Sequence, residues 1–287
     1  MKKRILVLGS TGMLGHVLTE TLLTNNHFEI FDLSYRKKLR VETIIQDIRE
    51  ENKIANLINQ ISPDIIINCI GILIKESSYN PKNAIWINSY FPHFLSTTAQ
   101  KFGGRVIHVS TDCVFSGDKG PYEINDSTDA KDIYGKSKAL GELINNQDLT
   151  LRTSIIGPEL KLNGEGLLHW ILNQKTTING YKNVFWSGVT TLQLSNIINV
   201  ASELNITGIY HIAPKEQISK FELLSIINDC FKLKLKIVPV LKPSSDKSLI
   251  PSKISFNDTI TSYQQMVVEL KEYMVNNKLK YTHYFPS

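Results

Sequence analysis

The chain has 287 residues, of which 42% are hydrophobic and 21% are charged, and its formal net charge is +5 at pH 7. This length can bury a full core, and the composition excludes a disordered or fibrous chain. The first apolar run, residues 5–8, is too short for the core of a signal peptide or for a membrane span. We therefore expect a cytoplasmic protein without membrane contact.

The cysteines and the basic residues indicate neither a metal site nor a nucleic-acid partner. Cys69, Cys113 and Cys230 are an odd number without Cys-x-x-Cys spacing, so no disulfide and no zinc site are predicted. The densest basic run, residues 36–40, has one aromatic neighbour, Tyr35, and lacks the interleaved stacking residues of a single-strand binder.

A glycine turn follows the first apolar run directly. The run at residues 5–8 reads as a strand, residues 9–15 as the turn, and residues from 14 to 22 as a helix with apolar side chains on one face. Strand, glycine turn and helix in this order are typical of dinucleotide binding, because the exposed amides and the helix dipole attract a pyrophosphate. The predicted cofactor-binding residues of the turn are Gly9, Thr11, Gly12, Met13, Leu14 and Gly15.

Charged residues after the turn leave the choice of dinucleotide open. Residues 28–32 read as the second strand, and Asp32 at its end can accept hydrogen bonds from an adenosine ribose, which favours NAD. Arg36 and its neighbour Lys37 can instead pair with the 2′-phosphate of NADP. Asp47, followed by Ile48, is a candidate for contacting the adenine, although it could equally cap a helix over residues 50–61.

The remaining pattern predicts an α/β fold with a doubly wound parallel Rossmann sheet. A continuous apolar strand over residues 64–71 brings Cys69, Ile70 and Gly71 to the cofactor, and further strands cover residues 105–110 and 149–156. The helix over residues 84–102 contains Pro92, which predicts a kink or a late start. We expect a dinucleotide-binding domain over residues 1–156, which residues 191–213 rejoin. A smaller, mostly α-helical substrate lobe is expected over residues 157–190 and 214–287.

Three side chains that can take part in proton transfer follow the strand at residues 105–110: a hydroxyl, a phenol and an ammonium. Thr111 begins the loop, and Tyr134 and Lys138 are four residues apart, so in a helix they share one face. A phenol beside an ammonium loses its proton more easily. Tyr-x-x-x-Lys alone is a common accident, and the glycine turn upstream is what favours a functional reading.

With the glycine turn, Ser110-Thr111-Asp112, Tyr134-x-x-x-Lys138 and Arg152-Thr153-Ser154 in this order, the chain resembles the extended short-chain dehydrogenase/reductases. Within them it is most similar to the dTDP-4-dehydrorhamnose reductase family. This resemblance implies that Thr111, Tyr134 and Lys138 form a catalytic triad and that Asn88 supports a proton relay. It also implies NADPH or NADH as cofactor, with Lys138 contacting its ribose.

The implied reaction is reduction of the 4-keto group of a nucleotide-linked 6-deoxyhexose, in the making of bacterial surface polysaccharides. A UDP-linked 2-acetamido-2,6-dideoxy-4-ketohexose is an alternative substrate, and a sugar-nucleotide epimerase uses the same triad. A 4,6-dehydratase is disfavoured, because Cys113 stands where that class has a glutamate. A cofactor-sensing regulatory protein is the alternative without catalysis. The resemblance is also compatible with a homodimer.

Overall fold

The computed structural model describes residues 2–285, which divide into two compact units. The first unit comprises the residues up to Phe115 together with 127–152 and 195–210. The second comprises 116–126, 153–194 and the residues from His211 onward.

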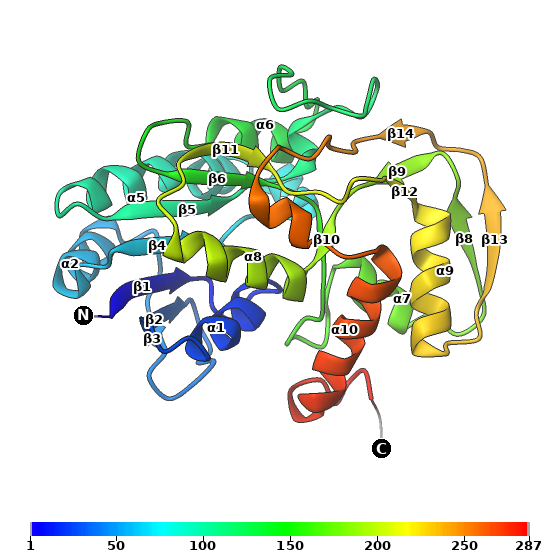
Figure 1. Cartoon of the computed structure of the whole chain (residues 1–287), viewed down its shortest axis with the longest axis horizontal. Helices are drawn as coiled ribbons and strands as arrows, with labels where there is room; N and C mark the ends of the chain where they lie inside the picture. The colour runs from blue at the N-terminus through cyan, green and yellow to red at the C-terminus, as the bar shows by residue number, and fades with distance from the viewer. Residues whose placement is uncertain (1, 286–287) are drawn as a thin grey trace. The chain divides into compact units, whose positions relative to one another are not determined.

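A seven-stranded sheet forms the centre of the first unit, in the order β11-β6-β5-β4-β1-β2-β3 (Figure 1). Parallel pairing joins β1 to β2 and β4, β2 to β3, and β5 to β4 and β6. The predicted doubly wound parallel sheet is confirmed. Its strands are β1 (Lys3–Leu8), β2 (Phe28–Ser34), β3 (Ile44–Ile45), β4 (Ile65–Asn68), β5 (Arg105–Val109), β6 (Leu149–Arg152) and β11 (Gly208–His211).

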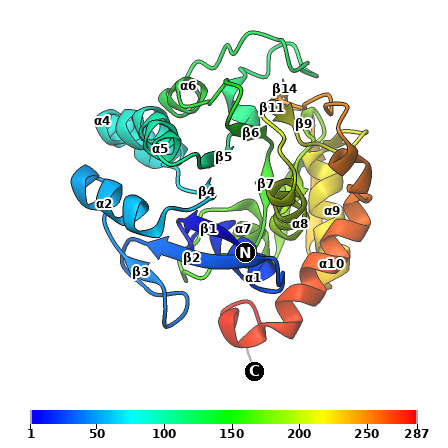
Figure 2. The same ribbon diagram turned by 60° about the vertical axis from the view of Figure 1, so that its left-hand side comes forward.

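Helices cover both faces of this sheet (Figure 2). On one face, apolar side chains of α2 and α5 pack against those of β1 and β4 in a single core cluster. On the other face lie α1 and the later part of α8, which a hydrogen bond between Asn25 and Asn199 connects. The helices of this unit are α1 (Gly15–Leu23), α2 (Glu51–Ile61), α3 (Ile74–Tyr79), α4 (Pro81–Ala84), α5 (Phe91–Gln100), α6 (Ile133–Leu140) and α8 (Thr191–Glu203).

The strand order reverses between β1 and β4, and this reversal decides where a ligand can enter. In open α/β sheets the loops at the carboxyl ends of two such strands diverge to opposite faces and leave a crevice. Here those loops are residues 9–15 after β1 and residues 69–73 after β4. The sheet therefore presents the glycine turn at the position where this fold binds ligands.

The helix predicted over residues 84–102 contains a π-helical segment, Ile85–Tyr90, between α4 and α5. Pro92 has no N–H to give to the carbonyl of Asn88, so the regular ladder is interrupted one turn earlier. Gly141 packs against that carbonyl, since an added Cβ would lie 1.8 Å from the Asn88 oxygen. The irregularity predicted from Pro92 is thus present, and it brings α6 close to Asn88.

The second unit has its own core, formed by helices around small sheets. Its helices are α7 (Leu167–Leu172), α9 (Lys220–Phe231) and α10 (Tyr263–Asn276). Its strands are β7 (Ile155–Ile156), β8 (Thr177–Tyr181), β9 (Val184–Trp186), β10 (Val189–Thr190), β12 (Ile218–Ser219), β13 (Lys236–Val240) and β14 (Ser245–Asp246). Strands accompany the helices of this lobe, which the sequence pattern does not anticipate.

Within residues 2–285, no helix has both the length and the apolar character needed to cross a bilayer.

Candidate active site

The glycine turn is built so that its backbone lies against the start of α1. A Cβ on Gly15 would lie 2.0 Å from the carbonyl oxygen of Gly9, so only glycine permits this approach. Gly9 has a φ of +83°, and the amide of Gly12 donates to its carbonyl at 2.9 Å. The buried His16 ring contacts the turn, since its Nδ1 lies 2.7 Å from the carbonyl oxygen of Gly12.

This turn fits a pyrophosphate. Among the residues that the structure describes, the amides of Thr11, Met13 and Leu14 donate to no protein acceptor. The buried hydroxyl of Ser10 likewise has no partner within the described chain. Such a group of free donors at a helix N-terminus attracts an anion, which matches the diphosphate of a dinucleotide.

The loop after β4 lies beside this turn. The amide of Cys69 donates to the carbonyl of Leu8 at 3.1 Å, and a Cβ on Gly9 would lie 2.9 Å from Cγ1 of Ile70. The structure thus brings Cys69 and Ile70 next to the glycine turn, as a shared dinucleotide site requires. Gly71 follows in the same loop, within reach of the Asn88 side chain.

Thr111 and Tyr134 meet at the end of β5. Thr111 lies close enough to the Tyr134 phenol to lower its pKa, and the Thr111 hydroxyl donates to Oδ1 of Asp112 at 3.0 Å. Gly135 makes the meeting possible, because a Cβ there would lie 2.2 Å from the carbonyl oxygen of Cys113. The N-terminus of α6 therefore packs directly on the loop that carries Thr111.

Burial raises the pKa of Tyr134, nearby Cys113 raises it further, and the hydrogen bond with Thr111 lowers it. The lowering by Lys138 expected from the sequence is not found. The Lys138 ammonium instead donates to the carbonyl of Val109 at 2.8 Å. A phenol of raised pKa keeps its proton at neutral pH, so Tyr134 is suited to donate a proton rather than to accept one.

Lys138 is 4% exposed and lies on α6 one turn after Tyr134. Burial lowers the pKa of Lys138 to about 8, while the charge of Glu142 opposes that shift. The ammonium is therefore less stable than on an exposed lysine, although it is still the main form at neutral pH.

Asn88 is fully buried, and its side chain makes hydrogen bonds to other parts of the protein. Its Oδ1 accepts from the amide of Ile72 at 2.8 Å, and its Nδ2 donates to the Ile72 carbonyl and to the Ser137 hydroxyl, each at 3.0 Å. Asn88 thereby ties the loop after β4 to α6. The proton relay implied by the resemblance stays a prediction.

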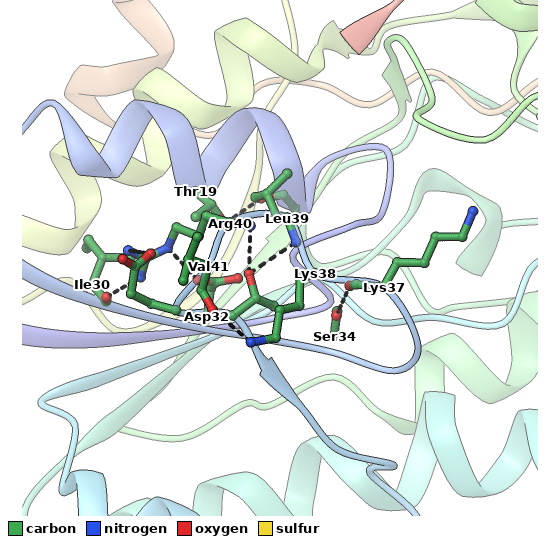
Figure 3. A network of polar contacts seen from close by, with 12 residues as sticks. Thr19, Ile30, Asp32, Ser34, Lys37, Lys38, Leu39, Arg40 and Val41 are labelled. Atoms are coloured by element: carbon green, nitrogen blue, oxygen red, sulfur yellow. Dashed lines mark hydrogen bonds and ion pairs between the residues drawn. The ribbon is translucent and has the colours of Figure 1, made fainter.

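Asp32 does not lie where the sequence suggests (Figure 3). The strand β2 continues to Ser34, so Asp32 lies two residues before its end and is completely buried. Nε of Arg40 donates to Oδ1 of Asp32 at 2.6 Å, and Nη2 of Arg40 donates to the Ile30 carbonyl at 2.7 Å. Oδ1 of Asp32 is thus paired with a cation, whereas its buried Oδ2 has no partner among the described residues, so the contact with a ribose stays a prediction.

Exposed charges follow at the end of β2. The Arg36 guanidinium stacks over the ring of Tyr35 at 4.5 Å from its centroid, and that of Arg49 lies at 5.6 Å. Nε and Nη2 of Arg49 both donate to the Asp47 carboxylate, and these hydrogen bonds lower the pKa of Asp47.

Two expectations for residues 47 and 48 need correction in detail. The residue that precedes α2 is Glu50, which makes no side-chain cap, so Asp47 does not cap the helix. The side chain of Ile48 is 7% exposed and belongs to the core cluster under the sheet. The contact of Asp47 and Ile48 with a cofactor stays a prediction.

Some residues that build the site make contacts that the sequence pattern does not reveal. Glu142 and Arg152 form a buried ion pair of 2.7 Å behind β5, with side chains 2% and 5% exposed, and the Ser110 hydroxyl donates to the same carboxylate. Arg40 lies within a basic run, and His16 lies within an ordinary helical pattern, so neither position indicates a buried contact. Their contacts are seen only in the structure, although these partners lie within ten residues in the chain.

The fold and this site define a dinucleotide-binding protein of the extended short-chain dehydrogenase/reductase type. The family model described as the RmlD substrate binding domain matches residues 2–251, and the chain belongs to that family. The resemblance predicted from the motifs is thereby confirmed.

Known proteins similar to this chain include reductases and a subunit of another enzyme. A structure titled hypothetical dTDP-4-dehydrorhamnose reductase from Sulfolobus tokodaii is 27% identical, with a TM-score of 0.78, and the match covers 90% of this chain and 95% of that one. The dTDP-4-dehydrorhamnose reductase of Bacillus anthracis in complex with NADP has a TM-score of 0.80 at 22% identity, over 95% and 99% of the two chains. Methionine adenosyltransferase 2 subunit beta of Bos taurus is 25% identical, over 80% of this chain and 73% of its own length.

Proposed function

We propose that the protein reduces the 4-keto group of a nucleotide-linked 6-deoxyhexose with NADPH or NADH. The observation that carries this proposal is the close approach of Thr111 and Tyr134 where α6 packs on the loop after β5, with Lys138 one turn further along α6. The similar proteins named as dTDP-4-dehydrorhamnose reductases support the same chemistry.

Each residue of this group has a distinct task. A bound reduced nicotinamide would supply the hydride to the ketone carbon. Thr111 hydrogen-bonds the ketone oxygen, and Tyr134 gives that oxygen its proton as negative charge develops. The Lys138 ammonium, which donates to the carbonyl of Val109, would hold the nicotinamide ribose of the bound cofactor. The backbone amides of the glycine turn hold the diphosphate of the dinucleotide.

The turnover assay tests this function directly. The purified protein is given dTDP-linked and UDP-linked 4-ketohexoses, including a 2-acetamido sugar, with NADPH or NADH, and the absorbance of the reduced nicotinamide is followed. We expect oxidation of the cofactor with at least one sugar nucleotide. Tightly held cofactor that is never consumed would favour an epimerase instead.

The surroundings of Asp32 favour NADPH over NADH. Asp32 is buried and paired with Arg40, whereas Arg36 is exposed above Tyr35 at the end of β2. A guanidinium at that position can pair with the 2′-phosphate of NADPH, and a buried carboxylate cannot repel it strongly when its charge is already compensated.

Replacing Arg36 tests this preference. We expect Arg36→Ala to raise the KM for NADPH roughly tenfold, the loss of one charged hydrogen bond, and to leave the KM for NADH unchanged. Lys38→Ala is the matched control, since the Lys38 ammonium already donates to the carbonyl of Val41 at 2.8 Å. Equal losses with both cofactors would show that Arg36 does not select the phosphate.

The pH dependence of the reaction follows from Lys138. Because burial lowers the pKa of Lys138 to about 8, the ammonium is present below that pH and is lost above it. We expect kcat/KM to fall as the pH rises through 8, and the fall to move to higher pH in Lys138→Arg, whose guanidinium keeps its charge. A pH–rate profile from 6 to 10 measures both, and a flat profile up to pH 9.5 would contradict the role of the charge.

A second candidate is a cofactor-binding subunit of another enzyme. The similarity to methionine adenosyltransferase 2 subunit beta, over 80% of this chain, favours it. Such a protein would bind a dinucleotide through the same glycine turn without turning it over. Binding of NADPH in calorimetry, together with absence of turnover on every sugar nucleotide, would support this candidate.

We also propose that the protein works in the cytoplasm as a homodimer. Its three cysteines are free thiols, as expected in a reducing compartment. In the first unit, Tyr90 before α5 and Leu140 at the end of α6 are 45% and 68% exposed, which suits contact with a second copy. Light scattering of the purified chain determines its mass in solution.

A further inference from the structure

His108 lies in the middle of β5, completely buried, and has no task in the reaction described above. Its ring lies between two polar side chains from different elements. Nδ1 is 3.2 Å from Nδ2 of Asn68, at the end of β4, and Nε2 is 3.4 Å from Nζ of Lys138 on α6. A buried imidazole next to the lysine of the site can influence the proton on that lysine.

Asn68 determines which nitrogen of His108 carries the proton. The amide of Ile70 donates to Oδ1 of Asn68 at 3.1 Å, so Nδ2 is the atom that Asn68 turns toward His108. An amide NH₂ only donates, so Nδ1 of His108 must offer its lone pair. Burial keeps the pKa of His108 far below 6.5, so the ring is neutral and its one proton lies on Nε2.

This tautomer directs an N–H toward Lys138. An ammonium has three donors and no acceptor, so it confronts the Nε2–H donor to donor. A neutral amine has a lone pair and can accept that hydrogen. The side chain of His108 therefore disfavours the charged form of Lys138 and favours the uncharged one.

Other groups around Lys138 act on the same proton. Glu142, after the end of α6, favours the ammonium, and its carboxylate is shared with Arg152. The thiol of Cys69, after β4, lies nearby, and the carbonyl of Val109 on β5 accepts from Nζ in either form. Tyr134 is one turn away on the same helix. Of these groups, His108 alone is oriented to oppose the charge with an N–H.

We propose that His108, held by Asn68 in its Nε2–H form, is a positioning residue that prepares Lys138 to release its proton within the site. When the ammonium gives its proton to the Tyr134 phenolate that the reduction leaves, the neutral amine accepts the hydrogen bond from Nε2–H. The benefit to catalysis rests on the proposed reductase function. The arrangement of the three side chains does not, so it can be tested on the protein without substrate.

The first measurement is the tautomer. In protein labelled with ¹⁵N-histidine, the resonances of His108, assigned with His108→Leu, are expected to show a protonated Nε2 and a bare Nδ1 at pH 7. A protonated Nδ1 would overturn the proposal, because Nε2 would then accept from the ammonium and stabilise it. The tautomer is measured in the unaltered protein. The variant His108→Leu serves only to assign the resonance, through the loss of one signal.

The second measurement is the titration of Lys138. In protein labelled with ¹³C at the lysine Cε, the Lys138 resonance is assigned by its absence in Lys138→Met and followed from pH 6 to 11. We expect the midpoint to rise by roughly one pH unit in His108→Leu, a tenfold change in proton affinity. A side chain that acts only through burial predicts the opposite, since leucine is more apolar than imidazole, so an unchanged or lower midpoint would overturn the proposal.

His93→Leu is the matched control. His93 lies on α5, where its Nε2 is 2.9 Å from the carbonyl of Leu140, and its replacement should leave the Lys138 midpoint unchanged. With a substrate in hand, the alkaline fall of kcat/KM should move upward with the midpoint in His108→Leu. If the tautomer and the midpoint behave as expected but no sugar nucleotide is turned over, the proposed function fails and the role of His108 in holding Lys138 stands.

Discussion

Tyr134→Phe is expected to lower kcat by roughly 10²- to 10⁴-fold, the usual contribution of a positioned proton donor. Burial raises the pKa of the phenol, so Tyr134 holds a proton that it can give to a developing alkoxide. A phenyl ring keeps the packing and removes only the hydroxyl that carries this proton. Turnover with the preferred sugar nucleotide, measured with saturating cofactor, tests the expectation.

Tyr90→Phe is the matched control for this variant. Tyr90 belongs to the same unit, and its hydroxyl donates to Glu51 at 3.0 Å on the surface of the protein. We expect it to keep the turnover of the wild type. If Tyr134→Phe binds the cofactor normally, melts at the same temperature and keeps its rate, then Tyr134 is not the proton donor.

Glu142→Ala should lower the free energy of unfolding by about 3–5 kcal/mol, because it leaves the Arg152 guanidinium buried without its carboxylate. The two side chains are only 2% and 5% exposed, and Nε and Nη2 of Arg152 lie 2.7 Å from Oε1 and Oε2 of Glu142. The Ser110 hydroxyl loses the same partner, at 2.7 Å. Denaturant unfolding monitored by circular dichroism measures the loss.

A double variant separates the pair from its single charges. Replacing Glu142 and Arg152 together by methionine removes both buried charges, and much of the lost stability should return. Glu50→Ala is the surface control, since its ion pair with Lys53 is largely exposed and should contribute little. A double variant as unstable as Glu142→Ala would show that the hydrogen bonds around the pair, rather than the unpaired charge, carry the stability.

The sheet could be predicted because its strands are encoded locally. Residues 5–8 and 65–67 are continuous apolar runs, and both are buried as the central strands β1 and β4. Pro92 predicts the irregularity of its helix, because proline lacks the N–H that would donate to the carbonyl in the preceding turn. The glycine spacing from Gly9 to Gly15 likewise indicates that the backbone at Gly15 lies close to the backbone at Gly9.

The charged residues could not be placed in the same way. The sequence predicts Asp32 and Arg36 as two competing cofactor contacts, whereas in the structure Oδ1 of Asp32 is paired with Arg40, eight residues later. A sequence shows that a carboxylate lies near the end of a strand. Whether that carboxylate pairs with a cation of the protein or contacts a ligand depends on which cations lie beside it in the fold. The pKa of Tyr134 was misjudged for a related reason, because burial outweighs a cation that is turned toward the backbone of β5.

Local sequence patterns predict the elements whose cause lies within one turn or one strand: the parallel strands, the glycine turn, and a tyrosine and a lysine on one helix face. The contacts between polar groups of different elements, such as Thr111 with Tyr134, Asn68 with His108, and Glu142 with Arg152, are seen only in the folded protein. The physical reason is that backbone conformation and apolar burial act over short stretches of chain. The protonation and pairing of a buried group instead depend on neighbours that are distant in the sequence.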